Sequence, residues 1–308
     1  MKRLPILALL LFGAAPAGAA PKVVASIVPV HAIVAAVMGE KGTPELLLSG
    51  QMSEHAASLS PQQLAALAGA DLIFMATPNV EIRLGQISGS EAVEGKAFVA
   101  LAEAPGVSHL KLREGGPWEA HDHEEAGNIE GAEGVSAYNG HVWLSPANAK
   151  AMAATVAAEL AKADPGNAAA YAANAAAFAE ESDRLQVEIA AQLAPVKDKP
   201  FIVFHDAYPY FEQAFGLSAV GSIADSTAEP PSAKRLGEIR AKLAATGAGC
   251  VFREPQFDDR FAATVVEDSS ARLGVLDAVG ADLTPGPGAY FQLMRNLAAS
   301  LKTCLSGT

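Results

Sequence analysis

Three of the seven histidines in the chain stand far apart in the sequence, each in a short segment that neither a helix nor a strand requires. They are His55, His141 and His205. Imidazole is a borderline ligand, and three converging imidazoles favour zinc over calcium or magnesium. The sequence therefore predicts one zinc site assembled from distant parts of the fold.

Each of these histidines also has an ordinary interpretation when it is taken alone. His55 is typical of a surface loop, His141 of a helix start, and His205 of a hydrogen-bonded packing residue at the end of a strand. Glu54, beside His55, offers a carboxylate oxygen as a fourth ligand or simply adds negative charge. His31 lies in the first predicted helix, where we expect it to pack or to form a hydrogen bond.

The first twenty residues have the organisation of a secretory signal. Lys2 and Arg3 form a charged start, residues 4–12 are apolar, and small residues precede a cleavage site near Ala19 or Ala20. The apolar run is too short to span a bilayer as a permanent helix. No cysteine near the cut offers a lipid anchor, so we expect a periplasmic protein that is cleaved and released.

The mature chain is acidic. Cleavage removes two positive charges and no negative ones, so the net charge moves from −12 to about −14. Nucleic acids and anionic membranes both bind basic surfaces, so the acidic charge argues against both as partners. About 288 residues remain, enough for two modest domains or one large one, and no later apolar run reaches the length of a membrane span.

Cys250 and Cys304 are the only cysteines, and an exported chain meets oxidising conditions. A pair without the spacing of a redox or zinc motif predicts a structural disulfide. The alternative is that the two thiols bind metal.

Runs of apolar, β-branched residues alternate with helical stretches rich in alanine and leucine, which predicts an α/β fold with parallel sheets. Strands are expected at residues 23–28, 72–76, 97–101, 201–204, 250–253 and 274–276, and helices at 32–38, 61–68, 147–163 and 232–246. Ligands of such sheets bind beyond the carboxyl ends of the strands. His205 directly follows one of these runs.

One long helix is predicted in the middle of the chain, after the start signal Asp164-Pro165. Its apolar residues recur at spacings of seven and four, and its length is about 40 Å. It is expected to join two lobes rigidly, although a helix within one domain is an alternative. The predicted division is a signal peptide at 1–20, an N-terminal lobe at 21–163, a linking helix at 164–194 and a C-terminal lobe at 195–308. The acidic, glycine-rich segment 113–140 is predicted to be a mobile surface loop.

These segments resemble those of the zinc-specific solute-binding proteins of ABC importers, the ZnuA-like branch of the cluster A-I metal receptors. The resemblance covers essentially the whole mature chain. It is carried by Ser53-Glu54-His55, by His141-Val142-Trp143-Leu144-Ser145-Pro146, by Phe204-His205-Asp206-Ala207-Tyr208, and by residues 24–29, 251–257 and 276–280.

The resemblance implies two α/β lobes joined by one long helix, with the metal in the cleft between them. It implies His55, His141 and His205 as ligands, and a histidine rather than a carboxylate at position 205 points to zinc. The fourth ligand stays open between Glu54, water and Asp277. Polar groups beside the site are expected to orient the ligands, and the candidates are Asp206, Arg253 and Glu254.

Two departures from the family pattern limit what the resemblance implies. The loop before the second ligand holds only His121 and His123, with His109 slightly upstream, so any auxiliary capture of metal is expected to be weak. No histidine follows His205, so a second metal site of the usual form is not predicted.

The predicted function is capture of Zn²⁺ in the periplasm and its delivery to a membrane permease powered by a separate ATPase. The protein is expected to be a monomer and not an enzyme, and the chain has no phosphate-binding motif of its own. The alternatives are a manganese or iron receptor of the same fold and a secreted zinc hydrolase, although the chain lacks an HExxH pair. An adhesin-like role is disfavoured because no anchor is found.

Overall fold

The computed structural model describes residues 20–55, 58–113, 118, 138–224 and 230–307. The predicted signal peptide, apart from Ala20, lies outside the described residues, as do His121, His123 and most of the predicted loop 113–140.

The described residues form two four-stranded sheets, and the strands within each sheet are parallel. In spatial order the first sheet consists of β2 (Glu45–Leu46), β1 (Val23–Ala25), β3 (Leu72–Met75) and β4 (Ala97–Ala100). The second consists of β6 (Ala219–Ser222), β5 (Phe201–Val203), β7 (Cys250–Arg253) and β8 (Arg272–Val275). Both sheets share one strand order, and the predicted α/β class is confirmed.

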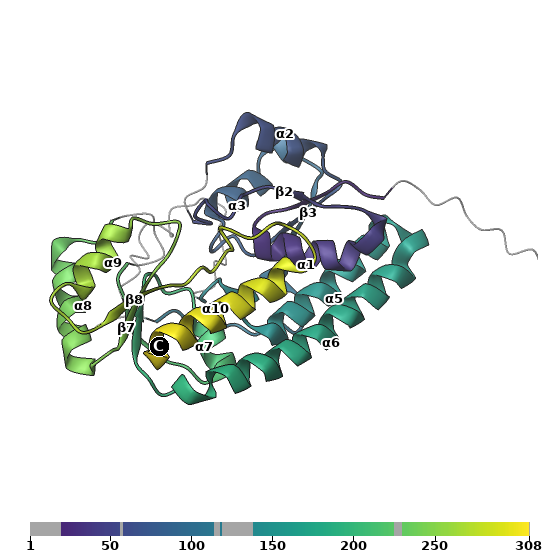
Figure 1. Cartoon of the computed structure of the whole chain (residues 1–308). Helices are drawn as coiled ribbons and strands as arrows, with labels where there is room; N and C mark the ends of the chain where they lie inside the picture. Colours follow the sequence, from purple (N-terminus) through teal and green to yellow (C-terminus); the bar gives the residue numbers. More distant parts are fainter. Residues whose placement is uncertain (1–19, 56–57, 114–117, 119–137, 225–229, 308) are drawn as a thin grey trace, which may run out of the picture.

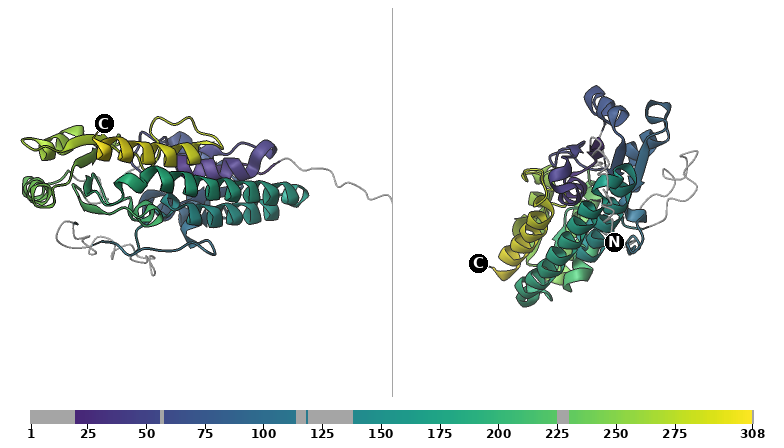
Figure 2. Two further views of the ribbon diagram at one scale, coloured as in Figure 1. Left: turned by 60° about the horizontal axis from the view of Figure 1, so that its bottom comes forward. Right: turned by 90° about the vertical axis from the view of Figure 1, so that its right-hand side faces the viewer.

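Helices surround both sheets (Figure 1). They are α1 (Val28–Met38), α2 (Pro61–Gly69), α3 (Ile82–Ser88), α5 (Pro146–Ala163), α6 (Ala168–Leu193), α7 (Pro209–Phe215), α8 (Ala233–Thr246), α9 (Asp259–Val266) and α10 (Ala289–Ser306). The long helix α6 packs against α5, α1 and α10, and Figure 2 shows α5, α6 and α10 running lengthwise through the molecule. None of the helices in the described part of the chain is long and apolar enough to cross a membrane.

The long helix α6 has the buried stripe that its sequence predicts. It contains 26 residues, which gives a length of about 39 Å. The five positions of the predicted apolar stripe are all buried, and these are Tyr171, Phe178, Leu185, Ile189 and Leu193. The Tyr171 hydroxyl donates to Asp164, which fixes the chain just before the helix begins.

One predicted strand was too long. The run 23–28 leaves the sheet after Ala25, and α1 begins at Val28 with Pro29 in its first turn. Proline fixes φ near the helical value and has no N–H to give to a sheet, so it starts the helix despite the β-branched residues around it. The strands β2 and β6 were not predicted.

The core is continuous between the halves. A single cluster of buried apolar side chains includes residues of both sheets and of α1, α5, α6 and α10. In the C-terminal half, a disulfide joins Cys250 on β7 to Cys304 on α10, as predicted. The proposed domain boundaries stay a prediction.

Candidate metal centre

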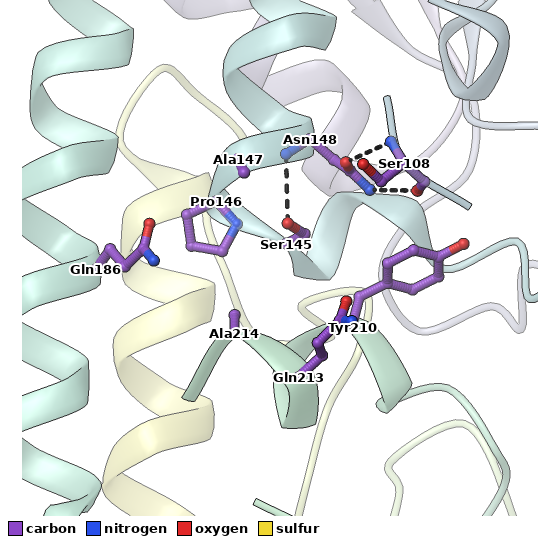
Figure 3. A pocket seen from close by; sticks show the side chains of 9 residues that line it. All are labelled: Ser108, Ser145, Pro146, Ala147, Asn148, Gln186, Tyr210, Gln213 and Ala214. Carbon is purple, nitrogen blue, oxygen red and sulfur yellow. Dashed lines mark hydrogen bonds between the residues drawn. The ribbon is translucent and has the colours of Figure 1, made fainter. Parts of the chain in front are cut away.

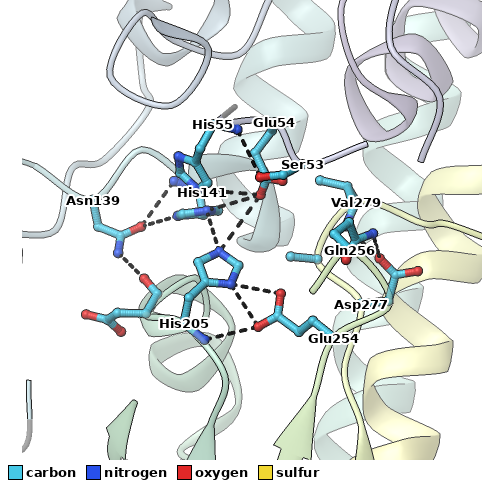
Figure 4. Close-up of polar contacts among 12 residues, drawn as sticks. Ser53, Glu54, His55, Asn139, His141, His205, Glu254, Gln256, Asp277 and Val279 are labelled. Carbon is cyan, nitrogen blue, oxygen red and sulfur yellow. Dashed lines mark hydrogen bonds and ion pairs between the residues drawn. The ribbon is translucent and has the colours of Figure 1, made fainter. Parts of the chain in front are cut away.

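His205 lies two residues beyond the end of β5, and Glu254 lies directly after β7, the neighbouring parallel strand. The Glu254 carboxylate accepts hydrogen bonds from the His205 backbone N–H and from its ring Nδ1, the latter at 2.8 Å. The other ring nitrogen of His205, Nε2, therefore faces away from Glu254 and toward the other half of the molecule (Figure 4).

His141 is placed by the start of α5. The short 3₁₀ turn Val142–Leu144 follows it, and the Ser145 side chain then caps α5 by accepting from a backbone N–H. Trp143 is fully buried, and its indole N–H donates to the Ala278 carbonyl of the C-terminal half. The ring of His141 is thereby held at the junction of the two halves.

Glu54 and His55 lie in the loop between β2 and α2. This loop rests on the C-terminal half, because the Gln256 side chain donates to the Gly50 carbonyl and the Gln51 side chain donates to the Ala281 carbonyl. A Cβ at Gly50 would lie 2.3 Å from the Gly280 carbonyl oxygen, so only glycine allows this close approach.

The four side chains converge on one point. Their potential ligand atoms all lie within 4.8 Å of one another. Glu54 Oε1 is 3.4 Å from His141 Nε2, 3.8 Å from His55 Nε2 and 3.9 Å from His205 Nε2, and the Nε2 atoms of His141 and His205 are 3.2 Å apart. Tetrahedral zinc with bonds of about 2.0–2.1 Å places its ligand atoms about 3.3–3.4 Å apart. The observed separations are close to that geometry.

The electrostatics of the cluster keep Glu54 ionised. Burial alone would raise the pKa of Glu54, but the neighbouring histidines, His141 above all, lower it to about 2. Burial would lower the pKa of His205, yet the Glu254 carboxylate raises it to about 9. Burial lowers the pKa of His141, which favours its neutral form. The cluster thus offers an anionic oxygen and a neutral imidazole within reach of each other.

Comparison with known proteins identifies the family. A family model described as the periplasmic zinc-uptake complex component A, ZnuA, matches residues 23–304. The chain belongs to this family. It is 46% identical to the high-affinity zinc uptake system protein ZnuA of Brucella suis biovar 1, over 96% of this chain and 94% of that one. It is 37% identical to the ZnuA protein of Paracoccus denitrificans, over 92% of each chain.

Solved structures show the same fold. A crystal structure of ZnuA aligns with a TM-score of 0.76 and 26% identity, covering 93% of this chain and 99% of that chain. A laminin-binding adhesin of Streptococcus agalactiae aligns with a TM-score of 0.77 but only 22% identity, over 92% of this chain and 99% of that one, which shows a shared fold alone.

The structure keeps Asp277 apart from the cluster. Its carboxylate accepts hydrogen bonds from the backbone N–H groups of Val279, Gly280 and Ala281, and also from the Gln256 side chain. These contacts hold the turn that follows β8. Among the described residues, the group suited to a metal contains Glu54 and not Asp277.

Two polar residues near the site were missed in the sequence. Arg113 forms ion pairs with Asp206 and Glu212, and its guanidinium lies over the Trp118 ring. Asn139 contacts both His141 and Asp206. The sequence marked Asp206 as a polar neighbour of the site, but its partner lies 93 residues away and no local pattern predicts the pairing.

The other described histidines lie outside the cluster. His31 is buried, and its Nε2 is 3.0 Å from the Pro44 carbonyl oxygen, in line with the hydrogen-bonding role expected for it. His109 is exposed and stacks on the Tyr138 ring.

A separate hollow of about 200 Å³ lies where α5, α6 and α7 meet (Figure 3). Its lining includes no histidine, cysteine or carboxylate. The buried side chain of Asn148 in this lining is already hydrogen-bonded to both backbone groups of Ser108. This hollow therefore has no group to hold a metal.

Proposed function

We propose that the protein captures Zn²⁺ in the periplasm and delivers it to the membrane permease of an ABC importer, which a separate ATPase powers. Membership of the zinc-uptake family supports this role. The observation that carries the proposal is the convergence of one carboxylate and three imidazoles from three distant segments at spacings suited to tetrahedral zinc.

The proposed ligands are Glu54, His55, His141 and His205. Glu54 is preferred to water because its buried carboxylate is ionised and already within 3.9 Å of the Nε2 atom of each histidine. Asp277 is disfavoured because its oxygens are committed to the turn after β8.

The donor set also separates zinc capture from the alternatives. Manganese prefers oxygen ligands, whereas three of the four donors here are nitrogen atoms. A catalytic zinc keeps a position open for water or substrate, whereas four protein donors fill a tetrahedral shell. The arrangement therefore supports binding and release rather than hydrolysis.

The test is a competitive titration of the mature protein against a chelating dye, with zinc and manganese run in parallel. We expect one tight zinc equivalent that manganese does not match and that His205→Ala abolishes. His109→Ala is the matched control, because it removes an exposed histidine outside the cluster. Unchanged tight binding in His205→Ala would place the metal elsewhere and overturn the ligand assignment.

The fourth ligand is tested by Glu54→Gln, which keeps the size of the side chain and removes its charge. We expect weaker zinc binding than in the wild type. Wild-type affinity in this variant would show that water or another group completes the shell.

A further inference from the structure

Asn139 is held rigidly next to the proposed ligand His141. Its side chain is buried, with 2% exposed. Its backbone N–H donates to the Leu110 carbonyl at 2.8 Å, and its own carbonyl accepts from the Tyr210 hydroxyl at 2.7 Å. The side chain therefore projects from a fixed backbone.

The amide of Asn139 fits in only one orientation. Its Nδ2 donates to the Asp206 carbonyl at 2.6 Å, and its Oδ1 accepts from the His141 backbone N–H at 3.1 Å (Figure 4). The reversed amide would set oxygen against the Asp206 carbonyl oxygen and NH₂ against the His141 N–H, and both contacts would be repulsive.

This orientation decides the tautomer of His141. The ring nitrogen Nδ1 lies 3.0 Å from the same Oδ1 of Asn139. That oxygen can only accept, so Nδ1 must carry the hydrogen. In the neutral ring the lone pair is then on Nε2, the atom that faces Glu54 and His205.

We propose that Asn139 is a positioning residue of the metal site, which fixes the Nδ1–H tautomer of His141 and ties this ligand to the His205-Asp206 segment. The inference rests on the proposed function, because it takes His141 and His205 as zinc ligands. It adds to that function the group that prepares one ligand for the metal before the metal arrives.

Asp206, which accepts the hydrogen bond from Asn139, is also held in place by other contacts. The Asp206 carboxylate is paired with Arg113, whose guanidinium also binds Glu212 on α7. The Asp206 carbonyl is therefore a fixed acceptor for Asn139. The Asn139 amide orients His141 without adding a charge to the site. The orienting group of His205 is instead the carboxylate of Glu254.

The experiment compares two substitutions that separate the two contacts. Asn139→Leu has a similar shape and loses the hydrogen bonds to both His141 and Asp206. Asn139→Asp keeps the acceptor for His141 but loses the donor to the Asp206 carbonyl. Asn174→Leu is the matched control, because it removes a side-chain hydrogen bond to the Val37 carbonyl far from the site.

Two readouts are used on folded protein. The first is ¹⁵N NMR of the histidine rings in the metal-free protein, with the His141 signals assigned from their loss in His141→Gln. The wild type and Asn139→Asp are expected to show a protonated Nδ1, and Asn139→Leu a mixture of tautomers. The second is zinc affinity, which we expect to fall by about 10- to 100-fold in Asn139→Leu, less in Asn139→Asp, and not at all in the control.

The outcomes distinguish this inference from the proposed function. An unprotonated Nδ1 in wild-type His141 would overturn the inference, whatever the zinc affinity. Wild-type affinity in Asn139→Leu would overturn it as well. Failure of the wild type to bind zinc would count against the proposed function, while the tautomer measured without metal would still decide the role of Asn139.

If Asn139→Leu does not fold, the NMR readout on the wild type and the affinity of Asn139→Asp remain decisive. Affinity of Asn139→Asp equal to that of the wild type would exclude a role for the hydrogen bond to the Asp206 carbonyl.

Discussion

The two sheets share one strand order, and each has a buried carboxylate beyond the third strand of that order, but the partners of these carboxylates differ. In the C-terminal half, Glu254 follows β7 and faces His205, which follows β5. In the N-terminal half, Glu81 lies beyond β3 and close to Ser26, which follows β1. The carboxylate of the N-terminal half thus has a hydroxyl as its neighbour, whereas that of the C-terminal half has an imidazole.

The group beside each carboxylate decides which side chains in that half are charged. Burial raises the pKa of Glu81 to about 7, although the Ser26 hydroxyl and the backbone N–H groups of Thr77 and Ala76 oppose the rise. The Glu254 carboxylate instead raises the pKa of His205 to about 9. A buried carboxylate beyond a parallel strand is therefore held toward its protonated form in one half and orients an imidazole in the other. Only the C-terminal half provides a candidate ligand within two residues of a strand end.

The largest expected effect concerns the disulfide, which is confined to the C-terminal half. The Cys250–Cys304 bond spans a sequence separation of 54 residues, and its removal should lower the free energy of unfolding by about 4 kcal/mol in the chain-entropy model. Urea unfolding of the Cys250→Ala/Cys304→Ala double variant measures this, with reduced wild type as the control. A loss below about 1 kcal/mol would show that packing of α10 alone holds this half together.

A second test targets Glu81, the buried carboxylate of the N-terminal half. The folded pKa of Glu81 is about 7 and its ordinary value is 4.5, so its stabilising contribution is complete below pH 4.5 and is lost as the pH rises through 7. The loss amounts to about 3 kcal/mol. Glu81→Gln should remove this pH dependence in denaturant unfolding of the metal-free protein, and the exposed Glu91→Gln should not. Parallel pH curves for Glu81→Gln and the wild type would contradict the comparison.

The corresponding substitution in the C-terminal half acts on metal binding. Glu254→Gln should weaken zinc binding by about 10- to 100-fold, which corresponds to about 1.4–2.7 kcal/mol. In the proposed site, zinc binds at Nε2 of His205 and must displace the proton there, which the nearby Glu254 carboxylate stabilises, so wild-type affinity should rise with pH up to about 9.

In the Glu254→Gln variant this rise should end at a lower pH, nearer the ordinary value of 6.5. Competition titrations across this pH range test both expectations, and affinities are compared where each curve has levelled off. The exposed Glu238→Gln on α8 is the control. An identical pH curve in Glu254→Gln and the wild type would refute the role given to Glu254.

The smallest expected effect lies at the contact between the halves. Gln51 is exposed, and its side chain donates to the Ala281 carbonyl and to Asp282. Gln51→Ala should change the free energy of unfolding by less than about 1 kcal/mol, because water replaces such bonds readily. Thermal unfolding gives this value. A larger loss would mean that the halves depend on each other more than their separate sheets indicate.

The sequence predicts those parts of the fold that have a local signal. The run Phe201–Val203 is apolar and β-branched, and the strand-end rule then places His205. The strand β2 has only two residues, too few for any alternation, and β6 ends in Gly221 and Ser222, which have weak strand preference. These two strands form only because a neighbouring strand offers them hydrogen bonds.

The candidate site was predictable to the same degree. The three histidines stand in distinctive segments, but the choice between Glu54 and Asp277 depends on which carboxylate the backbone already uses. The role of Asn139 was not predicted, although it lies two residues from His141, because it depends on an acceptor at Asp206 in the other half. Contacts of this kind have no periodicity in the sequence.

The chain enters and leaves segment 113–140 at nearly the same place, where Lys111 and Tyr138 form an isolated antiparallel bridge. Because the two ends are fixed to each other, the number of residues between them does not set the position of His141. The entropy cost of closing a loop rises only slowly with the number of residues in the loop. This is therefore a point at which residues can be added or removed, or a reporter domain inserted, while the candidate metal centre keeps its geometry.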